Sequence, residues 1–394
     1  MLIKTGAKSS STSQVWNNLK HQIVNASYCV LPTLQSLNST MAEEYKRWVD
    51  SMFSFYTASR LRRSVMRPAP PEEIIQIMKL ATEIKHHNAL ASDDTKKRSL
   101  RVLVLGGSVT VGIGCQWPDN LGMPKSRHWS VPGEKCAWSY HLERILNRVI
   151  FEGEEIVKID NIANGGISSE FGALVLEYQL FPDPDRTPDV VISAFSANDA
   201  QEPDSKKVFY EYLQNFVKAA QRLHPCNNHA PLVIMVNDLC GDVPPSVSLE
   251  QTGNIYMVSH WNNLMAVDYS STVKFKILVE NTTWAPLLSS NFQMHNGIGM
   301  HMGIAWTIGF NMLNSMVNVC NDAEIRTESY TEVVENTADT ANNNVTRGYD
   351  LNAFTIDHNR SISFAQPRNG RAFHSTIWKS RGKKGRSRFR ATEI

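Results

Sequence analysis

The chain has 394 residues, of which 42% are hydrophobic and 20% are charged, and its formal net charge is +2 at pH 7. This composition is sufficient for one sizeable core with additions at the ends of the chain. The nearly neutral charge and the absence of any long apolar stretch argue against a nucleic-acid partner and against a membrane span.

Residues 1–97 are expected to form a helical extension. Within Ala42–Ser64, apolar side chains recur at spacings of three and four, which is typical of an amphipathic helix. The proline-rich stretch Arg67–Pro71 interrupts this pattern, and a second helix is predicted over Glu72–His86, whose leading glutamates suit a helix N-terminus. We expect these helices to serve as scaffold, with a lid over a binding site as the alternative.

The segment Arg101–Gly114 carries the strongest functional signal. It begins with the unbroken apolar run Val102–Leu105, as in a buried parallel strand, and continues into Gly106-Gly107-Ser108. A strand that ends at small residues leaves the Ser108 hydroxyl exposed at the carboxyl edge of the sheet, where α/β proteins bind their ligands. Taken alone, the same residues also fit a plain turn.

The loop that follows, Gln116–Lys135, is rich in Pro, Gly and Trp and is expected to shape the entrance to a site at this edge. Cys115 and Cys136 flank the loop and are candidates for a disulfide. None of the six cysteines belongs to a Cys/His cluster with metal-ligand spacing. A helix is predicted next, over Ala137–Val149.

A second glycine turn follows the short strand predicted over Glu155–Ile159. In the sequence DNIANGGISS, four residues separate Asn161 from Gly166, and the serine pair Ser168–Ser169 closes the segment. A main-chain N–H held at such a turn can point at a developing negative charge. The alternative, which is compatible with the first, is that one of the serines caps the helix predicted over Glu170–Leu180.

A third polar turn, Ser196–Asp199, follows the buried strand predicted over Val190–Phe195. The Asn198 side chain can offer an amide donor at the same edge of the sheet. The alternative is that Asn-Asp caps the next helix, predicted over Ser205–Arg222. Further strands are predicted over Leu232–Val236 and Lys274–Val279.

Two histidines, His295 and His301, lie six positions apart before an apolar helix predicted over Gly303–Val319. An imidazole beside a serine can take the hydroxyl proton and later return it to a leaving group. A loop histidine can equally be a satisfied polar residue.

Strands and helices alternate between residues 98 and 320. This predicts an α/β domain, a three-layer α/β/α sandwich with a central parallel sheet. Residues 321–394 are polar and then basic, and we expect a disordered tail in which the basic run Arg368–Arg390 is solvated or contacts anionic surfaces.

The ordered set Gly-Gly-Ser, Asn-x4-Gly, Asn-Asp and His-x5-His resembles the SGNH (GDSL-type) hydrolase superfamily over about residues 98–318. The resemblance implies a flavodoxin-like fold and a serine ester hydrolase that forms an acyl-enzyme on Ser108, with His295 as general base. It also implies an oxyanion hole built from the N–H groups of Ser108 and Gly166 and the amide of Asn198. Neither a metal nor an organic cofactor is implied, and the substrate would be a small-molecule, glycan or lipid ester.

The chain departs from the family pattern at two informative places. Gly107 stands where the aspartate of Gly-Asp-Ser is usual, and Phe292 stands where the acid that orients the catalytic imidazole is expected. The groups left to orient the imidazole are the backbone carbonyl of Phe292 and the carboxylates of Asp238 and Glu280.

Two alternatives of function remain open: an O-acyltransferase that moves the acyl group to a sugar hydroxyl, and a catalytically impaired scaffold that binds acylated glycans or lipids. Residues 1–13 have no apolar core, so they are not expected to be a secretory signal. Five Asn-x-Ser/Thr sequons nevertheless favour a glycoprotein of the secretory pathway; they begin at Asn25, Asn38, Asn281, Asn344 and Asn359.

Overall fold

The computed structural model describes residues 43, 47, 50–52, 54–93, 97–113, 115, 136–151, 154–182, 187–200, 205–223, 230–238, 245–274 and 297–338. The chain divides into two compact units, Met1–Val333 and Val334–Ile394. Of the second unit, only the end of a helix, to Ala338, is described. All five sequons, the loop 116–135 and the basic run of the tail lie outside the described residues.

A six-stranded sheet forms the centre of the first unit, with strand order β1-β6-β5-β4-β2-β3. Strands β2 to β6 are parallel to their neighbours, and β1 adds an antiparallel edge. Counted along the chain, the five parallel strands have the order 2-1-3-4-5, which is the flavodoxin-like arrangement. The six strands are β1 Val65–Arg67, β2 Leu100–Gly106, β3 Val157–Asn161, β4 Val190–Ala194, β5 Leu232–Asn237 and β6 Met265–Asp268.

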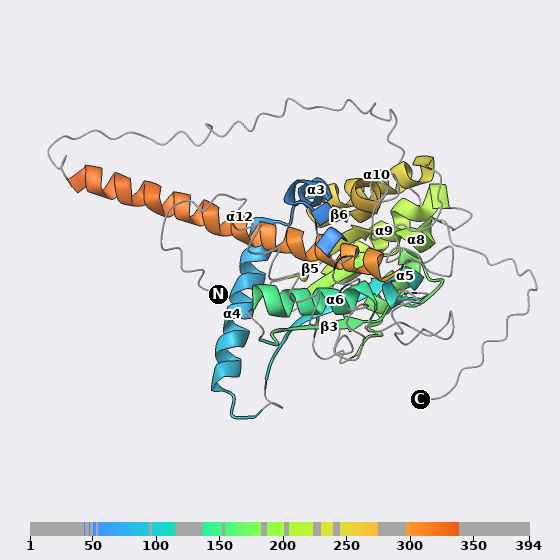
Figure 1. The fold of residues 1–394 in the computed structure, drawn as a ribbon, viewed down its shortest axis with the longest axis horizontal. Coiled ribbons are helices and arrows are strands. Elements are labelled where there is room, and N and C mark those ends of the chain that lie inside the picture. Colours follow the sequence, from blue (N-terminus) through green and yellow to red (C-terminus); the bar gives the residue numbers. More distant parts are fainter. Residues whose placement is uncertain are drawn as a thin grey trace, which may run out of the picture. The chain divides into compact units, whose positions relative to one another are not determined.

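The central strands are buried along their whole length, as their continuous apolar sequences predict. Every residue of β2, β4 and β5 is buried, whereas the edge strand β3 is mixed. Side chains alternate between two apolar clusters: Val102 and Val104 belong to one, and Leu103 and Leu105 belong to the other. The predicted α/β sandwich is therefore confirmed, with helices on both faces of the sheet (Figure 1).

One face of the sheet is covered by α3, α4, α6 and α12, and the other by α7, α9 and α10. The first group comprises α3 Ala58–Arg63, α4 Pro71–Leu90, α6 Trp138–Ile145 (which continues as the π-helix η4 Leu146–Ile150) and α12 Ile298–Ala338. The second comprises α7 Ser169–Glu177, α9 Ser205–Gln221 and α10 Pro245–Trp261. Three short elements follow strands: α5 Ser108–Val111, α8 Ser196–Asp199 and the π-helix η5 Ser270–Lys274.

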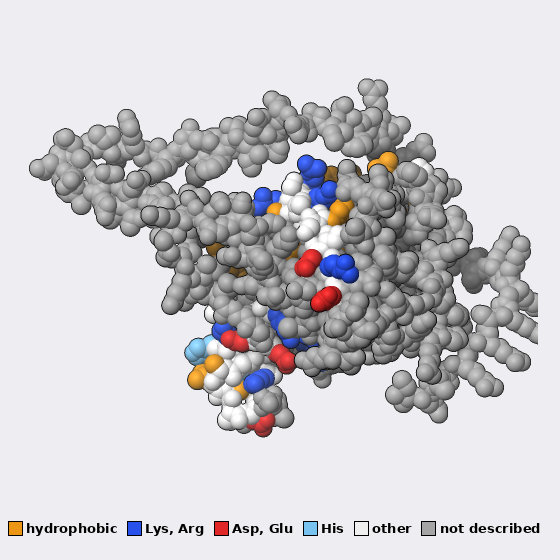
Figure 2. Space-filling model, in the orientation of Figure 1, with side chains coloured by type: hydrophobic (Ala, Val, Ile, Leu, Met, Phe, Trp, Pro, Cys, Tyr) orange, Lys and Arg blue, Asp and Glu red, His pale blue; other side chains and the backbone are white. Residues whose placement is uncertain are grey.

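The region preceding residue 98 contributes more than helices to this fold. Val65 in β1 pairs with Val267 in β6, so the sheet is mixed and not purely parallel as expected. Helix α4 buries Ile74, Ile77 and Ile84, which recur at helical spacing and join the main core. Arg62 and Arg63 of α3 are exposed, and Figure 2 shows basic side chains gathered over this helix.

One helix boundary differs from the sequence prediction, and one predicted strand lies almost entirely outside the described residues. Helix α12 continues to Ala338, past residue 320, since neither glycine nor proline occurs between Phe310 and Ala338 to end it. Of the strand predicted over 274–279, Lys274 lies in η5 and the other residues are outside the described part of the chain.

Candidate active site

The three polar turns predicted from the sequence meet at one edge of the sheet. Ser108 is the first residue of α5 and follows β2, and Asn198 lies in α8 directly after β4. Strands β2 and β4 are neighbours, and Gly106 at the end of β2 is in register with Ala194 at the end of β4. Because the order of the strands reverses between β2 and β4, this is the topological switch point, where doubly wound sheets bind ligands.

Gly107 lies against the side chain of Asn198. A Cβ atom on Gly107 would overlap Asn198 Oδ1 and would lie 3.2 Å from Nδ2. The φ angle of Gly107 is −89°, which any residue can adopt, so the glycine is required for space and not for conformation. A side chain at position 107 would therefore displace the Asn198 side chain from the position it has here.

The second turn lies beside Ser108. A Cβ atom on Gly165 would lie 3.8 Å from the Ser108 Cβ and 2.8 Å from Ile113 Cδ1. Gly166, which is exposed, has φ +74°, in the left-handed region that favours glycine. The structure thus brings together Ser108, the glycine pair and Asn198. Gly165 was not singled out in the sequence, although the Gly-Gly pair was visible there.

Backbone hydrogen bonds fix the second turn to the strand that carries the serine. Ile162 N–H donates to the Val104 carbonyl at 3.0 Å, and Asn164 N–H donates to the Gly106 carbonyl at 3.1 Å. Asn161, at the end of β3, donates from Nδ2 to the Thr110 carbonyl of α5 at 2.9 Å. The residues that lead into the second turn are therefore hydrogen-bonded to the chain on both sides of Gly107 and Ser108.

Thr110 connects α5 to the neighbouring strands. Its hydroxyl lies 3.2 Å from the Ala194 carbonyl and 3.4 Å from Asp238 Oδ2, so it can donate to either. Asp238, one of the carboxylates that the sequence offered for orienting the imidazole of His295, follows β5 and is buried. Its contact with Thr110 puts this carboxylate against the helix that begins with Ser108.

Asp199, in the turn after β4, caps the N-terminus of helix α7. Its Oδ1 accepts a hydrogen bond of 2.8 Å from the N–H of Ser169, the first residue of α7. The predicted cap by Ser168 or Ser169 is wrong, because the N-cap residue Ser168 makes no side-chain cap bond and Ser169 Oγ has no hydrogen-bond partner among the described residues. The contact joins the turn after β4 to the turn after β3.

His301 has a similar structural role. It lies in the first turn of α12, as predicted for the second histidine, and is completely buried. Its Nδ1 accepts a hydrogen bond of 3.2 Å from the N–H of Trp138, the first residue of α6. His295, Phe292 and Glu280 lie outside the described residues.

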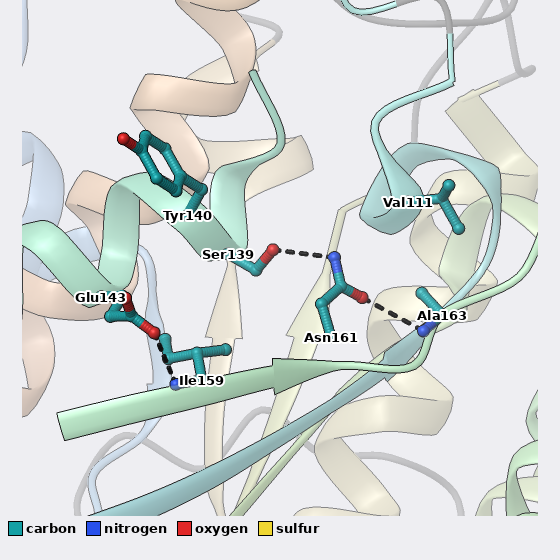
Figure 3. Close-up of a pocket in the computed structure, with 7 residues that line it drawn as sticks. All are labelled: Val111, Ser139, Tyr140, Glu143, Ile159, Asn161 and Ala163. Carbon is teal, nitrogen blue, oxygen red and sulfur yellow. Dashed lines mark hydrogen bonds between the residues drawn. The ribbon is translucent and has the colours of Figure 1, made fainter. Parts of the chain in front are cut away.

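A cavity of about 370 Å³ adjoins the candidate site between α5, α6 and the edge strand β3 (Figure 3). Burial raises the pKa of Glu143, and a hydrogen bond from Ile159 N–H opposes this shift. The residues that line the cavity are Val111, Ser139, Tyr140, Glu143, Ile159, Asn161 and Ala163.

Polar side chains at every fourth residue along α6 and η4 form hydrogen bonds with every second residue along β3. The helix and the strand stay in step because four residues of a helix span about 6 Å and two residues of a strand span about 6.7 Å. The helix thereby satisfies backbone groups on the open edge of the sheet, which protects the edge from pairing with another chain. The pairs are Ser139 Oγ with Asn161 Nδ2 (2.8 Å), Glu143 Oε2 with Ile159 N–H (2.7 Å) and the Asn147 amide with both backbone groups of Val157 (2.7 and 2.8 Å).

A disulfide joins Cys115 and Cys136, whose Cα atoms are 5.9 Å apart, so the pairing considered from the sequence is confirmed. It closes the loop 116–135 between the end of α5 and the start of α6. Among the described residues, no cluster of three or more His, Cys, Asp or Glu side chains could hold a metal ion. Likewise, no helix in the described part of the chain is both long and apolar enough to cross a bilayer.

No protein-family model and no curated protein matches this sequence. Among solved structures, the chain is similar to a two-domain esterase active on acetylated mannans, with 18% identity and a TM-score of 0.43 over 65% of this chain and 57% of that one. It is also similar to the psychrotrophic esterase EstA from Pseudoalteromonas sp., with 15% identity, a TM-score of 0.39 and coverage of 57% and 100%. Axe2, an acetylxylan esterase from Geobacillus stearothermophilus, gives 14% identity, a TM-score of 0.38 and coverage of 54% and 93%. The chain therefore spans little more than half the length of the mannan esterase.

Proposed function

We propose that this protein is a serine ester hydrolase of the SGNH type, which cleaves an acyl or acetyl ester through an acyl-enzyme on Ser108. The observation that carries the proposal is the convergence of Ser108, the Gly165–Gly166 turn and Asn198 at the switch point of a flavodoxin-like sheet. These are the nucleophile and the oxyanion donors that the sequence pattern predicts, contributed by three different strand ends.

In the proposed reaction, Ser108 Oγ attacks the acyl carbonyl carbon while the imidazole of His295 takes the hydroxyl proton. The imidazolium then gives this proton to the departing alcohol. Water, deprotonated by the same imidazole, attacks the acyl-enzyme and releases the carboxylic acid and free Ser108. No cofactor is needed at any step.

The negative oxygen of each tetrahedral intermediate would be held by the N–H groups of Ser108 and Gly166 and by Asn198 Nδ2. Each donor is expected to contribute roughly 3 kcal/mol of transition-state stabilisation. The contact of Asn198 with Gly107 supports this role, because it places the carboxamide against the residue that precedes Ser108. The contact of Gly165 with Ser108 supports the assignment of the second turn.

Hydrolysis of p-nitrophenyl acetate tests the proposal. We expect the native protein to release p-nitrophenol, and we expect Ser108→Ala and His295→Ala to lose this activity. Asn198→Ala should lower kcat by about 10²–10³-fold, the usual cost of one oxyanion donor. Ser259→Ala, which removes a buried serine hydroxyl from α10, is the matched control and should retain full activity.

The acceptor of the acyl group is tested with the same proteins. Transfer of acetyl from the p-nitrophenyl ester to a polysaccharide would identify an O-acyltransferase. A native protein that is inert toward esters would contradict the proposal and favour the impaired binding scaffold. Full activity in Ser108→Ala would exclude the mechanism.

A further inference from the structure

A hollow of about 520 Å³ lies on the helical layer formed by α9 and α10, away from Ser108. Trp261 and Asn262, at the end of α10, precede β6 and so lie toward the amino ends of the parallel strands, whereas Ser108 follows the carboxyl end of β2. The volume of the hollow is within the range of roughly 300–1,000 Å³ found for small-ligand sites. The lining residues are Tyr210, Glu211, Gln214, Asn215, Lys218, Trp261 and Asn262.

An exposed tryptophan forms one wall of the hollow. The Trp261 side chain is 59% exposed, and its ring meets that of Tyr210 edge-on, with centroids 5.5 Å apart and planes at 83°. Such an edge contact fixes the indole while leaving much of its surface open. The indole therefore presents a large flat apolar surface to solvent beside the polar groups of the hollow.

Amide groups in the hollow are held in place by a hydrogen-bond chain. Gln214 Nε2 donates to the Tyr210 hydroxyl at 2.8 Å, and Asn262 Nδ2 lies 3.3 Å from Gln214 Oε1. Asn262 Nδ2 also donates to the Val258 carbonyl at 2.8 Å. Each of these side chains retains further capacity: the Tyr210 hydroxyl proton, the second N–H of Gln214 and the Asn262 oxygen. Donors and acceptors are thus ordered beside the aromatic wall.

The charges at the hollow balance. Glu211 and Lys218 are both exposed on α9, one carrying a negative and one a positive charge. An anionic or cationic ligand would gain from one and lose from the other. A neutral ligand with both donors and acceptors fits the hollow best.

We propose that this hollow binds a neutral oligosaccharide segment, separately from ester cleavage. The C–H groups on one face of a pyranose ring are slightly positive and pack on the negative face of an indole, while the ring hydroxyls donate to and accept from amides. Trp261 provides the stacking surface, and Gln214, Asn215 and Asn262 provide the polar contacts. The site would hold a glycan chain to the protein whether or not Ser108 is reactive.

Affinity electrophoresis of the full chain in native gels tests this site, with xylan, glucomannan or mixed-linkage β-glucan as the soluble probe. At least one probe should retard the native protein, and Trp261→Ala should weaken this retardation about tenfold. Gln214→Ala should weaken it in the same direction. Tyr178→Ala is the matched control, because Tyr178 is an exposed aromatic residue (66%) on the neighbouring α7 side of this layer.

Two features separate this proposal from the catalytic one. Ser108→Ala should be retarded like the native protein, and retardation should be insensitive to added salt because the ligand carries no charge. Absence of retardation in all three gels, or equal retardation of Trp261→Ala, would overturn the proposal. A change of oligomeric state in Trp261→Ala without any glycan binding would identify the face as a protein contact instead.

Discussion

Gly107 and Asn198 are in direct contact across the switch point of the sheet, and the contact leaves no room for a side chain at position 107. The two residues belong to turns that follow different strands, β2 and β4. The glycine therefore links the position of the proposed nucleophile to the position of the proposed oxyanion donor. The Gly-Gly-Ser sequence is explained by packing, since the backbone angles at Gly107 do not require glycine.

Gly107→Ala is expected to destabilise the protein by about 1–3 kcal/mol, the usual cost of overpacking a buried site, and to lower the proposed esterase activity by about 10²–10³-fold by displacing Asn198. Gly253→Ala is the matched control: a Cβ there would meet nothing within 4 Å, and the residue lies inside helix α10. This control should gain roughly 0.5–1 kcal/mol. Denaturant titration and ester hydrolysis measure both effects, and a fully active, fully stable Gly107→Ala protein would contradict the packing argument.

Asp199→Ala is expected to lower the free energy of unfolding by about 1–3 kcal/mol, because it leaves the Ser169 N–H buried without its acceptor. Asp199→Asn keeps an oxygen at the same place and should retain most of the stability. Thermal denaturation of the three proteins compares these effects. Equal losses in the two variants would mean that the carboxylate charge, and not the hydrogen bond to α7, stabilises the fold.

Because His141 is buried, the protein is expected to lose stability in acid. Burial, with a smaller contribution from the charge of Arg144, lowers the pKa of His141 to about 4. The unfolded chain, with a histidine pKa of about 6.5, therefore binds the proton first as pH falls. Stability is unaffected above pH 6.5 and decreases by about 1.4 kcal/mol per pH unit between pH 6.5 and 4, about 3 kcal/mol in total.

The test is the pH dependence of unfolding in His141→Leu. This variant should lack the added slope between pH 6.5 and 4, whatever its offset in stability. His86→Leu, which changes an exposed histidine on α4, should keep the slope of the native protein. Parallel curves for the native protein and His141→Leu would refute the assignment.

Glu73 is expected to have the opposite effect, so that the protein loses stability as the pH rises. Burial, with a smaller contribution from Glu72, raises the pKa of Glu73 to about 7, and its Oε2 has no hydrogen-bond partner among the described residues. As pH rises from about 4.5 to 7, the unfolded chain ionises first, so the native state loses stability. Glu73→Gln should therefore exceed the native protein in stability by about 2 kcal/mol at pH 8, after a discount for the solvent that reaches this half-buried group.

The comparison variant for Glu73 is Glu72→Gln, which removes only the smaller cause of the shift. Its gain at pH 8 should be well below that of Glu73→Gln. At pH 4.5 the native protein and Glu73→Gln should be nearly equally stable. A constant difference between them from pH 4.5 to 8 would show that Glu73 is not the titrating group.

The elements that sequence reasoning found are those with long, regular patterns. The runs within β2, β4 and β5 were visible because both faces of these strands are buried, which makes the sequence continuously apolar. β1 and β6, with three and four residues, are too short to show a period.

Helix α10 was missed because its apolar and polar residues are mixed around the helix. It buries the polar side chains of Ser248, Gln251 and Ser259 together with apolar Ile255 and Val258, and it exposes apolar side chains such as Leu249 and Tyr256. A search for an amphipathic helix with an apolar inner face cannot detect such a segment.

In the candidate site, the sequence predicted the turns but not what holds them. Ser108, Gly166 and Asn198 were identified because each follows a predicted strand in a fixed order. The caps provided by Asp199 and His301 connect residues 30 and 163 positions apart, and no local pattern indicates such contacts. Tertiary structure alone reveals them.

The most direct test of the central claim is covalent labelling of the full chain with a fluorophosphonate ester, followed by peptide mass spectrometry. An activated serine displaces fluoride and keeps the phosphonyl group, whereas ordinary serines do not react. We predict one dominant adduct, on Ser108, that is absent from Ser108→Ala and strongly reduced in His295→Ala. Absence of an adduct on Ser108 in the native protein, or labelling of Ser108→Ala to the same extent at another residue, would contradict the assignment of Ser108 as the nucleophile.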